Sequence, residues 1–534
     1  MPWFKTVRTR FSNRFGRNLL LLPMPLMLCA NIAFAGTEPK MDQGIQIGDL
    51  APGRAMIWSR TDRPSRMMLQ YAFNPDFEQA VTIRGPYAME SSDFTARQDL
   101  VNLPESKDVY VKVWFEDLTN ERNACEPVNG HFQTIGKHDD IRFIWGGDTA
   151  GQGWGINENF GGMKIYETMR HSHPQFFIQS GDNVYSDGPI PESKVAENGK
   201  IWTNLVTLEV SKVAETLDEF RGRYKYNLLD ANLRRFNAEV PQVWQWDDHE
   251  VVNNWSDAKD LSGDSRYTVK DVPLLVARAA QAFHEYAPLR PHDAEEQGRI
   301  YRKLSYGNLL DVFVLDMRSY RGPNSGNMQT KESTETAFLG ETQLAWLQRE
   351  LKNSRAVWKV ISADMPLGLN ISDDFSHDPP QRWEAVANGN DGPAAGRELE
   401  IARLLKFIKH QRIANIVWLT ADVHYAAAHY YDPEQAASKD FLPFWEFVAG
   451  PLNAGSFGPN TVDGTFGPQV VFYKAPDPGQ VNLSPYAGLQ FFGEVNIDRL
   501  SKAMTVELKD MDGTVVFSKT LPAANKFGLF RYKD

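Results

Sequence analysis

The stretch Trp246-Asp-Asp-His-Glu-Val-Val-Asn-Asn-Trp255 follows directly on the apolar run Val243-Trp-Gln-Trp246. A short apolar run of this kind is typical of a strand that is buried on both faces of a sheet. The polar residues then fall in the loop just beyond the strand, where ligands bind in open α/β sheets. This stretch therefore predicts a layered α/β domain with its functional site at the carboxyl ends of its strands.

The same order of an apolar run followed by an aspartate recurs along the chain. The other candidates for buried strands are residues 143–145, 176–179, 312–315, 357–361 and 416–419. The aspartates that follow them are Asp148, Asp182, Asp316, Asp364 and Asp422. Stretches with helical periodicity lie between the strands, at residues 163–169, 274–284, 342–352 and 397–411. Strands that alternate with helices predict a layered α/β domain in which these aspartates meet at one edge.

The chain divides by its patterns into four parts. We predict a signal peptide at 1–35, an N-terminal β-sandwich at 42–137, an α/β domain at 140–484, and C-terminal strands at 485–534 that complete or flank it. Residues 42–137 contain short runs of β-branched and aromatic residues between turns, which is typical of a sandwich. Near the C-terminus, Asp510-Met-Asp-Gly513 predicts a hairpin turn.

The first 35 residues have the pattern of an export signal. Five basic residues precede an apolar run at 19–35, which ends in the small-x-small sequence Ala33-Phe34-Ala35. The short run and its prolines argue against a stable membrane span. Lipid attachment at Cys29 is the alternative, but Leu26-Met-Leu28 lacks the small residues usual before such a cysteine. We therefore expect a periplasmic or secreted protein.

The composition argues against two features, which are wrapping by nucleic acid and an internal disulfide. The chain carries 57 basic and 68 acidic residues, and removal of the leader would bring its net charge to about −16. An acidic surface repels phosphate backbones, so nucleic acid is not expected to wrap the protein. Cys125 is the only cysteine beyond the leader, so the mature chain has no internal disulfide.

Aspartates gathered at one edge of a sheet predict a metal site. Neighbouring carboxylates repel one another unless cations neutralise them. Oxygen ligands with one or two imidazoles favour hard or borderline metals, and a pair of such metals suits phosphoryl transfer. The alternative for any single aspartate is a helix N-cap. That alternative does not explain six strand ends with an aspartate, two of them with a histidine nearby.

Other motifs for phosphate chemistry are absent from the sequence. The glycines of Gly151-Gln-Gly-Trp-Gly155 lack the spacing of a dinucleotide-binding loop, and Trp154 occupies the place where the backbone would approach a pyrophosphate. No P-loop lysine follows, and the chain has no Gly-x-Ser-x-Gly nucleophile motif. The sequence therefore favours metal-assisted hydrolysis.

Three motifs together resemble the PhoD-like alkaline phosphatase/phosphodiesterase family, which belongs to the calcineurin-like and purple acid phosphatase group. They are Gly181-Asp-Asn-Val-Tyr185, the stretch 246–255 and Ala421-Asp-Val-His424. The resemblance covers about residues 44–500. It implies an immunoglobulin-like β-sandwich followed by a four-layer α/β/β/α metallophosphatase domain at 140–484. It also implies hydrolysis of phosphomonoesters or phosphodiesters outside the cytoplasm.

The resemblance implies metal-binding roles for residues in the matching motifs. Asp182 would bridge two metal ions, and Tyr185 would bind a ferric ion as its phenolate. His424 would bind the same iron, and Asp422 would bind the neighbouring metal, a calcium ion.

Two further ligand positions lie within the stretch 246–255 and at the end of the first strand. Within 246–255, Asp248 and Asn253 are both candidates for a metal ligand. Some family members carry a cysteine at the first strand end, where this chain has Gly147-Asp148, so Asp148 is the expected ligand. The implied cofactors are Fe³⁺ and Ca²⁺, with Zn²⁺ or Mn²⁺ as alternatives.

Two side chains are candidates for direct contact with the substrate. The metal pair is expected to activate a water for in-line attack at phosphorus. Arg318 resembles a phosphate-contacting arginine, with a salt bridge to Asp316 as the alternative. His249 is expected to contact phosphate or protonate the leaving oxygen, with an orienting role as the alternative.

The expected substrate is a small phosphoester, and the sequence leaves open both the choice between monoester and diester and the oligomeric state. Trp154, Trp202 and Trp445 are candidates to shape the entrance of the site. A different class of interpretation is a non-catalytic cell-surface binding protein built on a relic of the fold. The intact set of aspartate, tyrosine and histidine positions argues against it.

Overall fold

The computed structural model describes residues 38–291 and 296–524. The signal peptide predicted for residues 1–35 lies outside these described residues. Within the two described ranges, every helix is too short or too polar to cross a lipid bilayer. The described residues from Glu38 onward form one compact unit.

A nine-stranded sheet carries the first group of strands that the sequence predicts. Its order is β22 (Val515–Leu521), β21 (Met504–Asp510), β20 (Phe491–Ile497), β8 (Ile141–Gly146), β9 (Phe176–Ser180), β12 (Gln242–Gln245), β1 (Ile45–Ala51), β2 (Arg54–Arg60) and β5 (Thr95–Leu100). Strands β8, β9, β12 and β1 run parallel. The C-terminal strands extend this sheet, because β20 pairs antiparallel with β8.

A seven-stranded sheet carries the second group. Its order is β13 (Arg302–Tyr306), β14 (Leu310–Val314), β15 (Trp358–Ser362), β16 (Ile416–Thr420), β18 (Phe444–Val448), β17 (Ala426–Tyr431) and β19 (Pro468–Lys474). Strands β14, β15, β16 and β18 run parallel, so their carboxyl ends share an edge. A separate hairpin joins β10 (Ser193–Val195) to β11 (Ile201–Thr203).

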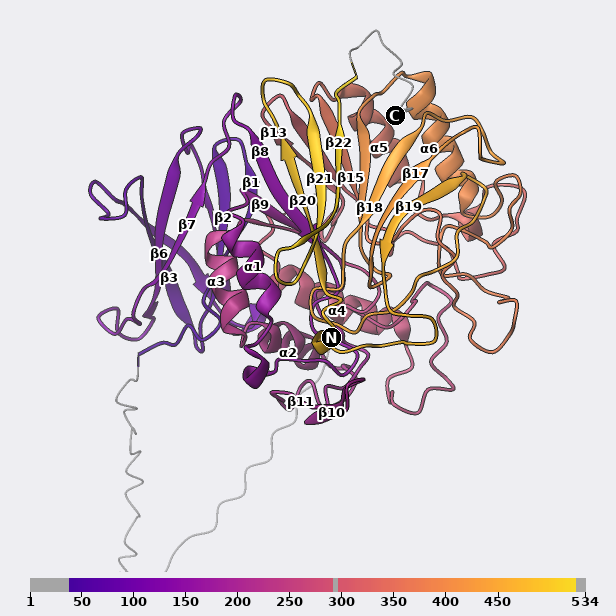
Figure 1. Cartoon of the computed structure of the whole chain (residues 1–534). Coiled ribbons are helices and arrows are strands. Elements are labelled where there is room, and N and C mark those ends of the chain that lie inside the picture. The colour runs from indigo at the N-terminus through magenta and orange to yellow at the C-terminus, as the bar shows by residue number, and fades with distance from the viewer. Residues whose placement is uncertain (1–37, 292–295, 525–534) are drawn as a thin grey trace, which may run out of the picture. The chain divides into compact units, whose positions relative to one another are not determined.

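Alternating side chains on the central strands produce four layers. Phe143 and Trp145 of β8 share one apolar core with Val312 and Val360 of the other sheet. The residue between them, Ile144, points into a second core with helices α1 (Lys164–His171), α2 (Leu217–Asn227), α3 (Ala231–Glu239) and α4 (Val272–Tyr286). The outer face of the seven-stranded sheet packs in the same way against α5 (Glu341–Asn353) and α6 (Glu398–His410). The order is therefore helix, sheet, sheet, helix (Figure 1).

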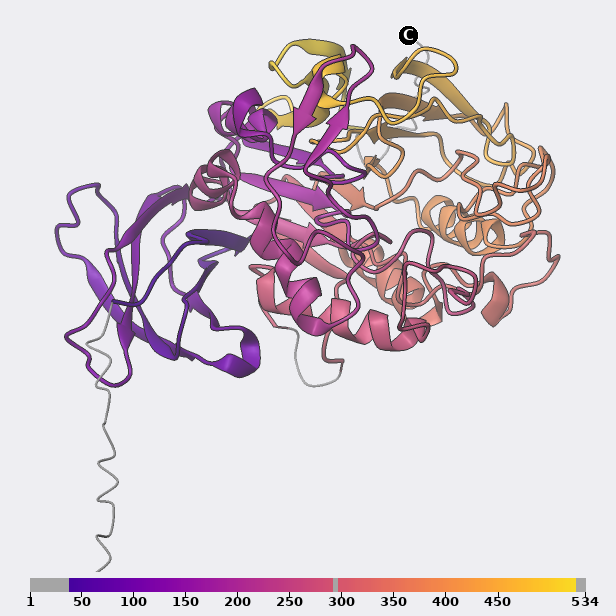
Figure 2. The same ribbon diagram turned by 90° about the horizontal axis from the view of Figure 1, so that it is seen from below.

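The N-terminal β-sandwich shares a sheet with the α/β layers. Its second sheet has the order β4 (Val81–Ala88), β3 (Ser65–Ala72), β6 (Asp108–Asp117) and β7 (Val128–Gln133). This sheet packs on β1, β2 and β5 through residues such as Leu69, Val111 and Ile57. Seven strands in two sheets form an immunoglobulin-like sandwich, seen in indigo and purple in Figure 2. The junction is β1, which pairs with β12 at Gly48 and Gln242.

Gly48 at this junction generates a prediction about stability. A β-carbon on Gly48 would lie 2.4 Å from the backbone oxygen of Pro288, which cannot move aside as a flexible side chain can. We expect Gly48→Ala to lower the free energy of unfolding by about 1–3 kcal/mol through overpacking. Urea denaturation followed by tryptophan fluorescence measures this. The matched control is Gly263→Ala, where an added β-carbon meets no atom within 4 Å. Equal stability of both variants would contradict the packing argument.

Candidate metal centre

The loops after the parallel strands of both sheets bring their aspartates together. Asp148 follows β8, Asp182 follows β9, Asp248 follows β12 and Asp422 follows β16. The first three side chains are almost completely buried, with exposed fractions of 2% or less, and Asp422 is half-buried. Residues that are more than 270 positions apart in the sequence therefore share one site.

Three overlapping groups of side chains have their ligand atoms within 4.8 Å of one another. They are Asp148, Asp182 and His424, then Asp182, Asp248 and His249, and finally Asp247, Asp248 and Asp422. Asp182 and Asp248 each belong to two of these groups. This sharing is the geometry that bridging carboxylates between adjacent cations require.

Many of the carboxylate oxygens in the cluster are buried without a partner. Both oxygens of Asp148, and one oxygen each of Asp182, Asp247, Asp248 and Asp422, accept no hydrogen bond from any described residue. An ionised carboxylate without a partner costs several kcal/mol to bury. Burial, together with neighbouring carboxylates, raises the pKa of Asp148, Asp182, Asp247 and Asp422 well above the ordinary value. Bound cations would remove this cost, so the donor set fits metal ions.

Tyr185 and His424 complete one end of the cluster with an oxygen and a nitrogen. The Tyr185 hydroxyl lies 3.0 Å from Nε2 of His424, and Nδ1 of His424 lies 2.5 Å from the Gly455 carbonyl oxygen. Burial lowers the pKa of His424 to about 3, so its ring is neutral. With Nδ1–H donating to the carbonyl, Nε2 retains a lone pair for a metal. Burial raises the pKa of Tyr185, and the carboxylates of Asp182 and Asp148 raise it further, so only a nearby cation would ionise the phenol.

The backbone of the ligand loops is strained. Asp148, Asp182, Asp422 and His424 have φ angles of 63°, 49°, 67° and 63°. The left-handed region is unusual for residues with a β-carbon, and each case costs on the order of 1–3 kcal/mol. Four such residues within one carboxylate cluster indicate that the fold holds these side chains in place for a function.

His249 lies beside the cluster on a fixed partner. Its Nδ1 is 2.7 Å from Oδ1 of Asp187, and its ring lies 4.4 Å from the Tyr185 ring, centroid to centroid. Burial lowers the pKa of His249, but the carboxylates of Asp187, Asp248 and Asp182 outweigh this and raise it well above the ordinary value. Nε2 of His249 lies 4.0 Å from Oδ1 of Asp248, so the ring faces the carboxylate cluster.

The two candidates within 246–255 occupy different positions. Asp248 belongs to two of the three groups and also accepts a 2.5 Å hydrogen bond from the backbone N–H of Asn254. The backbone N–H of Asn253 donates to Asp187, so this residue lies on the His249 side of the site. Asp248 therefore lies within the carboxylate cluster, and the contact described for Asn253 is made by its backbone.

Arg318 lies beneath the cluster, in the protein interior. Its guanidinium is completely buried and donates to Oδ1 of Asp247 over 2.6 Å and to Glu384, and it lies 3.4 Å from Asp364. The link to Asp316 is made by the Arg318 backbone N–H and not by the guanidinium. Asp316 itself accepts from the indole of Trp246 and belongs to none of the three groups. The geometry points to Arg318 as the group that holds Asp247.

Sequence reasoning assigned no role to four acidic residues of the site, which are Asp247 and the three described next. Asp187 orients His249, and Glu250 accepts hydrogen bonds from the backbone N–H groups of Asp247 and Asn183. Burial raises the pKa of Glu250 to about 7. Glu384 pairs with Arg318 from an irregular segment. Asp187 and Glu250 lie inside or next to the quoted motifs, which could have drawn attention to them, but Glu384 has no such signal.

The three tryptophans proposed to shape the entrance of the site lie in two different parts of the structure. Trp154 and Trp202 pack edge to face near the site, and the Trp154 indole donates to Asn482. Trp445 lies at the second position of β18, at the opposite end of the strand from the cluster. The expectation that Trp445 shapes the entrance is therefore wrong.

Comparison with known proteins adds family information to this geometry. Residues 143–508 match the family model described as PhoD-like phosphatase, and residues 28–136 match the model for the N-terminal domain of PhoD-like phosphatases. Alkaline phosphatase D of Bacillus subtilis (strain 168) is 33% identical over 310 residues, 55% of this chain. The alignment spans about half, 48%, of that relative's length.

Two solved structures share the fold. The structure of PhoD has a TM-score of 0.65 and 20% identity, with 93% of this chain and 94% of that chain covered. Purple acid phosphatase PPD1 from yellow lupin (Lupinus luteus) seeds has a TM-score of 0.54 and 10% identity, with coverage of 91% and 74%. At these identities the likeness concerns the fold alone, which is the four-layer metallophosphatase fold with an N-terminal sandwich.

The buried contact between Arg318 and Glu384 generates a prediction about stability. Replacing Glu384 by Gln leaves Arg318 and Arg321, which also contacts Glu384, without their shared countercharge. We expect Glu384→Gln to lower the free energy of unfolding by about 3–5 kcal/mol, the usual cost of breaking a buried ion pair. Urea titration gives the value, with Glu434→Gln at an exposed position as the control. A loss below 1 kcal/mol would show that the pair is not needed.

Proposed function

This chain belongs to the PhoD-like phosphatase family, and from this premise we propose that it is an exported, metal-dependent phosphoester hydrolase. The proposal rests on the cluster of buried carboxylate oxygens that have no partner among the described residues. Within this cluster, Asp182 and Asp248 are each shared between two adjacent groups. Such a cluster has no evident use in an apolar core, and it suits the binding of cations for phosphoryl transfer.

We assign the ligands from the chemistry of the donors. Asp148, Asp182, Tyr185 and His424 would hold one ion, and the phenol suggests Fe³⁺ there. Asp182, Asp248 and Asp422 would hold its neighbour, and oxygen donors alone suggest Ca²⁺. Zn²⁺ or Mn²⁺ is the alternative at either position. When bound, such ions lower the pKa of a water and neutralise phosphate oxygens.

The remaining residues position and transfer protons. His249 would donate from Nε2 to a phosphate oxygen or to the leaving oxygen, while Asp187 holds Nδ1 and so fixes the ring. Arg318 would act through Asp247, which it restrains, and not by contact with the phosphate. The substrate class is a small phosphoester outside the cytoplasm.

Removal of the proposed bridge should abolish metal binding and activity together. Asp182→Asn keeps the size of the side chain but removes its charge, so we expect less than 1% of the wild-type hydrolysis of p-nitrophenyl phosphate and its bis ester, on the order of the loss when an essential group is removed. Elemental analysis of the same sample should show loss of at least one ion per chain. The control, Asp477→Asn at an exposed loop position, should leave both values unchanged. Wild-type turnover by Asp182→Asn would refute the assignment.

His249 and Asp187 should affect turnover more than metal content. Because His249 would act by proton transfer, His249→Ala should lower kcat by about 10²–10⁴-fold while the metal stays bound. Asp187→Asn removes the carboxylate that raises the pKa of His249. The limb of the pH–rate profile that reports loss of the His249 proton should therefore move to lower pH. An unchanged profile would mean that this proton is not used.

Chelation should destabilise the protein increasingly as pH rises. The cluster aspartates have folded-state pKa values raised above the unfolded value, so the metal-free folded state binds more protons than the unfolded state. Without metal, the contribution of these aspartates to stability is therefore greatest at low pH and falls as pH rises above about 4. Metal replaces those protons, so the difference in Tm between untreated and chelated protein should grow from pH 5 to pH 8. A constant difference would contradict the metal assignment.

A further inference from the structure

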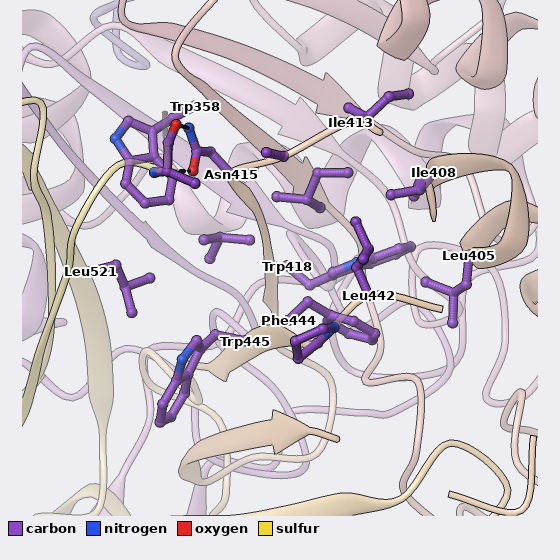
Figure 3. A pocket seen from close by; sticks show the side chains of 15 residues that line it. Trp358, Leu405, Ile408, Ile413, Asn415, Trp418, Leu442, Phe444, Trp445 and Leu521 are labelled. Atoms are coloured by element: carbon purple, nitrogen blue, oxygen red, sulfur yellow. Dashed lines mark hydrogen bonds between the residues drawn. The ribbon is translucent and has the colours of Figure 1, made fainter. Parts of the chain in front are cut away.

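Aromatic side chains gather in two places outside the metal cluster. One is an apolar pocket at the starts of β15, β16 and β18, where Figure 3 shows Trp358 and Phe444. The residues that line this pocket carry no charge, and Asp422 of the metal cluster follows the opposite end of β16. The second place surrounds Trp154, near the metal cluster, and it contains a cation, Lys194 of β10.

The ammonium group of Lys194 is bound to the loop 151–155. Its Nζ lies 3.9 Å from the centroid of the Trp154 ring and donates to the backbone carbonyl of Gln152 over 2.8 Å. The stem of the lysine packs on Gly153, where an added β-carbon would lie 3.0 Å from Cδ. Burial lowers the pKa of Lys194 to about 8, with no contribution from a described carboxylate, so the group is charged at neutral pH. The loop therefore provides the partners of this cation.

The first residue of the same loop packs against the ring of Tyr185. A β-carbon on Gly151 would lie 2.1 Å from Cγ and Cδ2 of Tyr185, so only glycine leaves room for the ring. The backbone N–H of Trp154 donates to the Gly151 carbonyl over 2.9 Å and closes a turn. Asn482 also restrains this turn, because it donates to the Gln152 carbonyl and accepts from the Trp154 indole. A shift of Trp154 would therefore move the backbone that contacts Tyr185.

The placement of the Tyr185 ring matters for the proposed ligand set. Its hydroxyl lies 3.0 Å from Nε2 of His424, and the loop begins three residues after Asp148. A metal ligand must lie within about 0.2 Å of its preferred distance from the ion. A loop that limits the movement of the ring therefore limits the movement of the phenol oxygen.

We propose that Lys194 is a positioning residue, which holds the loop 151–155 against the Tyr185 ring and so fixes the phenol at the metal centre. This inference rests on the proposed function, in which Tyr185 is a ligand. Lys194 acts through the loop and not by contact with the substrate. Lys200, on the same hairpin, offers a comparison, because its ammonium lies 5.5 Å from the centroid of the Tyr486 ring instead.

Nitration by tetranitromethane at pH 7 reports the exposure of Tyr185 and does not require activity. The full-length protein is treated after chelation, so that no bound ion protects the phenol. In Lys194→Met, we expect Tyr185 to be nitrated at least about tenfold faster than in wild type, because loss of a charge-assisted hydrogen bond lets the loop open more often. The matched control, Lys200→Met, should nitrate at the wild-type rate.

Tyr166 is the internal control for general loosening of the fold. It is 1% exposed, and its tryptic peptide and that of Tyr185 each contain no other tyrosine. A positioning role predicts that Tyr166 stays protected in Lys194→Met. Equal acceleration at both tyrosines would overturn the proposal, and so would an unchanged rate at Tyr185.

A second variant acts on the other side of the same contact. Gly151→Ala places a β-carbon against the Tyr185 ring and should also accelerate its nitration. An unchanged rate in folded Gly151→Ala would contradict the role of the loop. The Lys194→Met result keeps the test decisive if Gly151→Ala does not fold.

Hydrolysis of p-nitrophenyl phosphate by the metal-loaded protein separates this inference from the proposed function. We expect kcat of Lys194→Met to fall about 10–100-fold, the usual effect of removing a group that orients a metal ligand, while Lys200→Met keeps the wild-type value. A wild-type kcat in Lys194→Met would overturn the positioning role. If wild type hydrolysed no phosphoester, the proposed function would fail, and selective nitration would still show that Lys194 holds Tyr185.

Discussion

Desolvation of like charges is the constraint on which the rest of this structure depends. Asp148, Asp182, Asp248 and Asp422 meet in one buried site, and several of their oxygens have no partner among the described residues. Each ionised group alone would cost several kcal/mol, and their mutual repulsion adds to that cost. A stable fold with this feature needs either protons or cations at the site. The family and the ligand types both favour cations.

The surrounding fold is arranged to hold those carboxylates. Two sheets, each covered by helices on its outer face, place the carboxyl ends of their parallel strands at a common edge. Left-handed backbone at Asp182 and Asp422 aims the side chains inward, and such strain persists only where the surroundings fix the loop. Those surroundings are polar and buried. Arg318 restrains Asp247, and Glu250 joins the loops after β9 and β12.

The sequence predicted what depends on local pattern and missed what depends on tertiary pairing. The helix expected at 397–411 is Glu398–His410, because its apolar residues repeat at helical spacing. Helices α2 and α3 were not predicted within the segment 190–240. Around α2, Arg221 and Arg223 are buried alongside apolar residues, and Arg221 pairs with the distant Glu285, so no clear apolar stripe marks the helix. Glu384 was not predicted because its role depends on pairing with Arg318, which lies 66 residues away in the sequence.

The most direct measurement is anomalous X-ray diffraction from crystals of the protein purified without chelators, combined with its visible absorption spectrum. We expect one ion within bonding distance of Asp148, Asp182, Tyr185 and His424, and a second within bonding distance of Asp182, Asp248 and Asp422. An iron at the first position would add a tyrosinate-to-iron absorption band. The crystals could instead show no ion, with these carboxylates bridged only by protons or water. If the same protein sample still hydrolyses phosphoesters, the assignment of a metal centre is wrong.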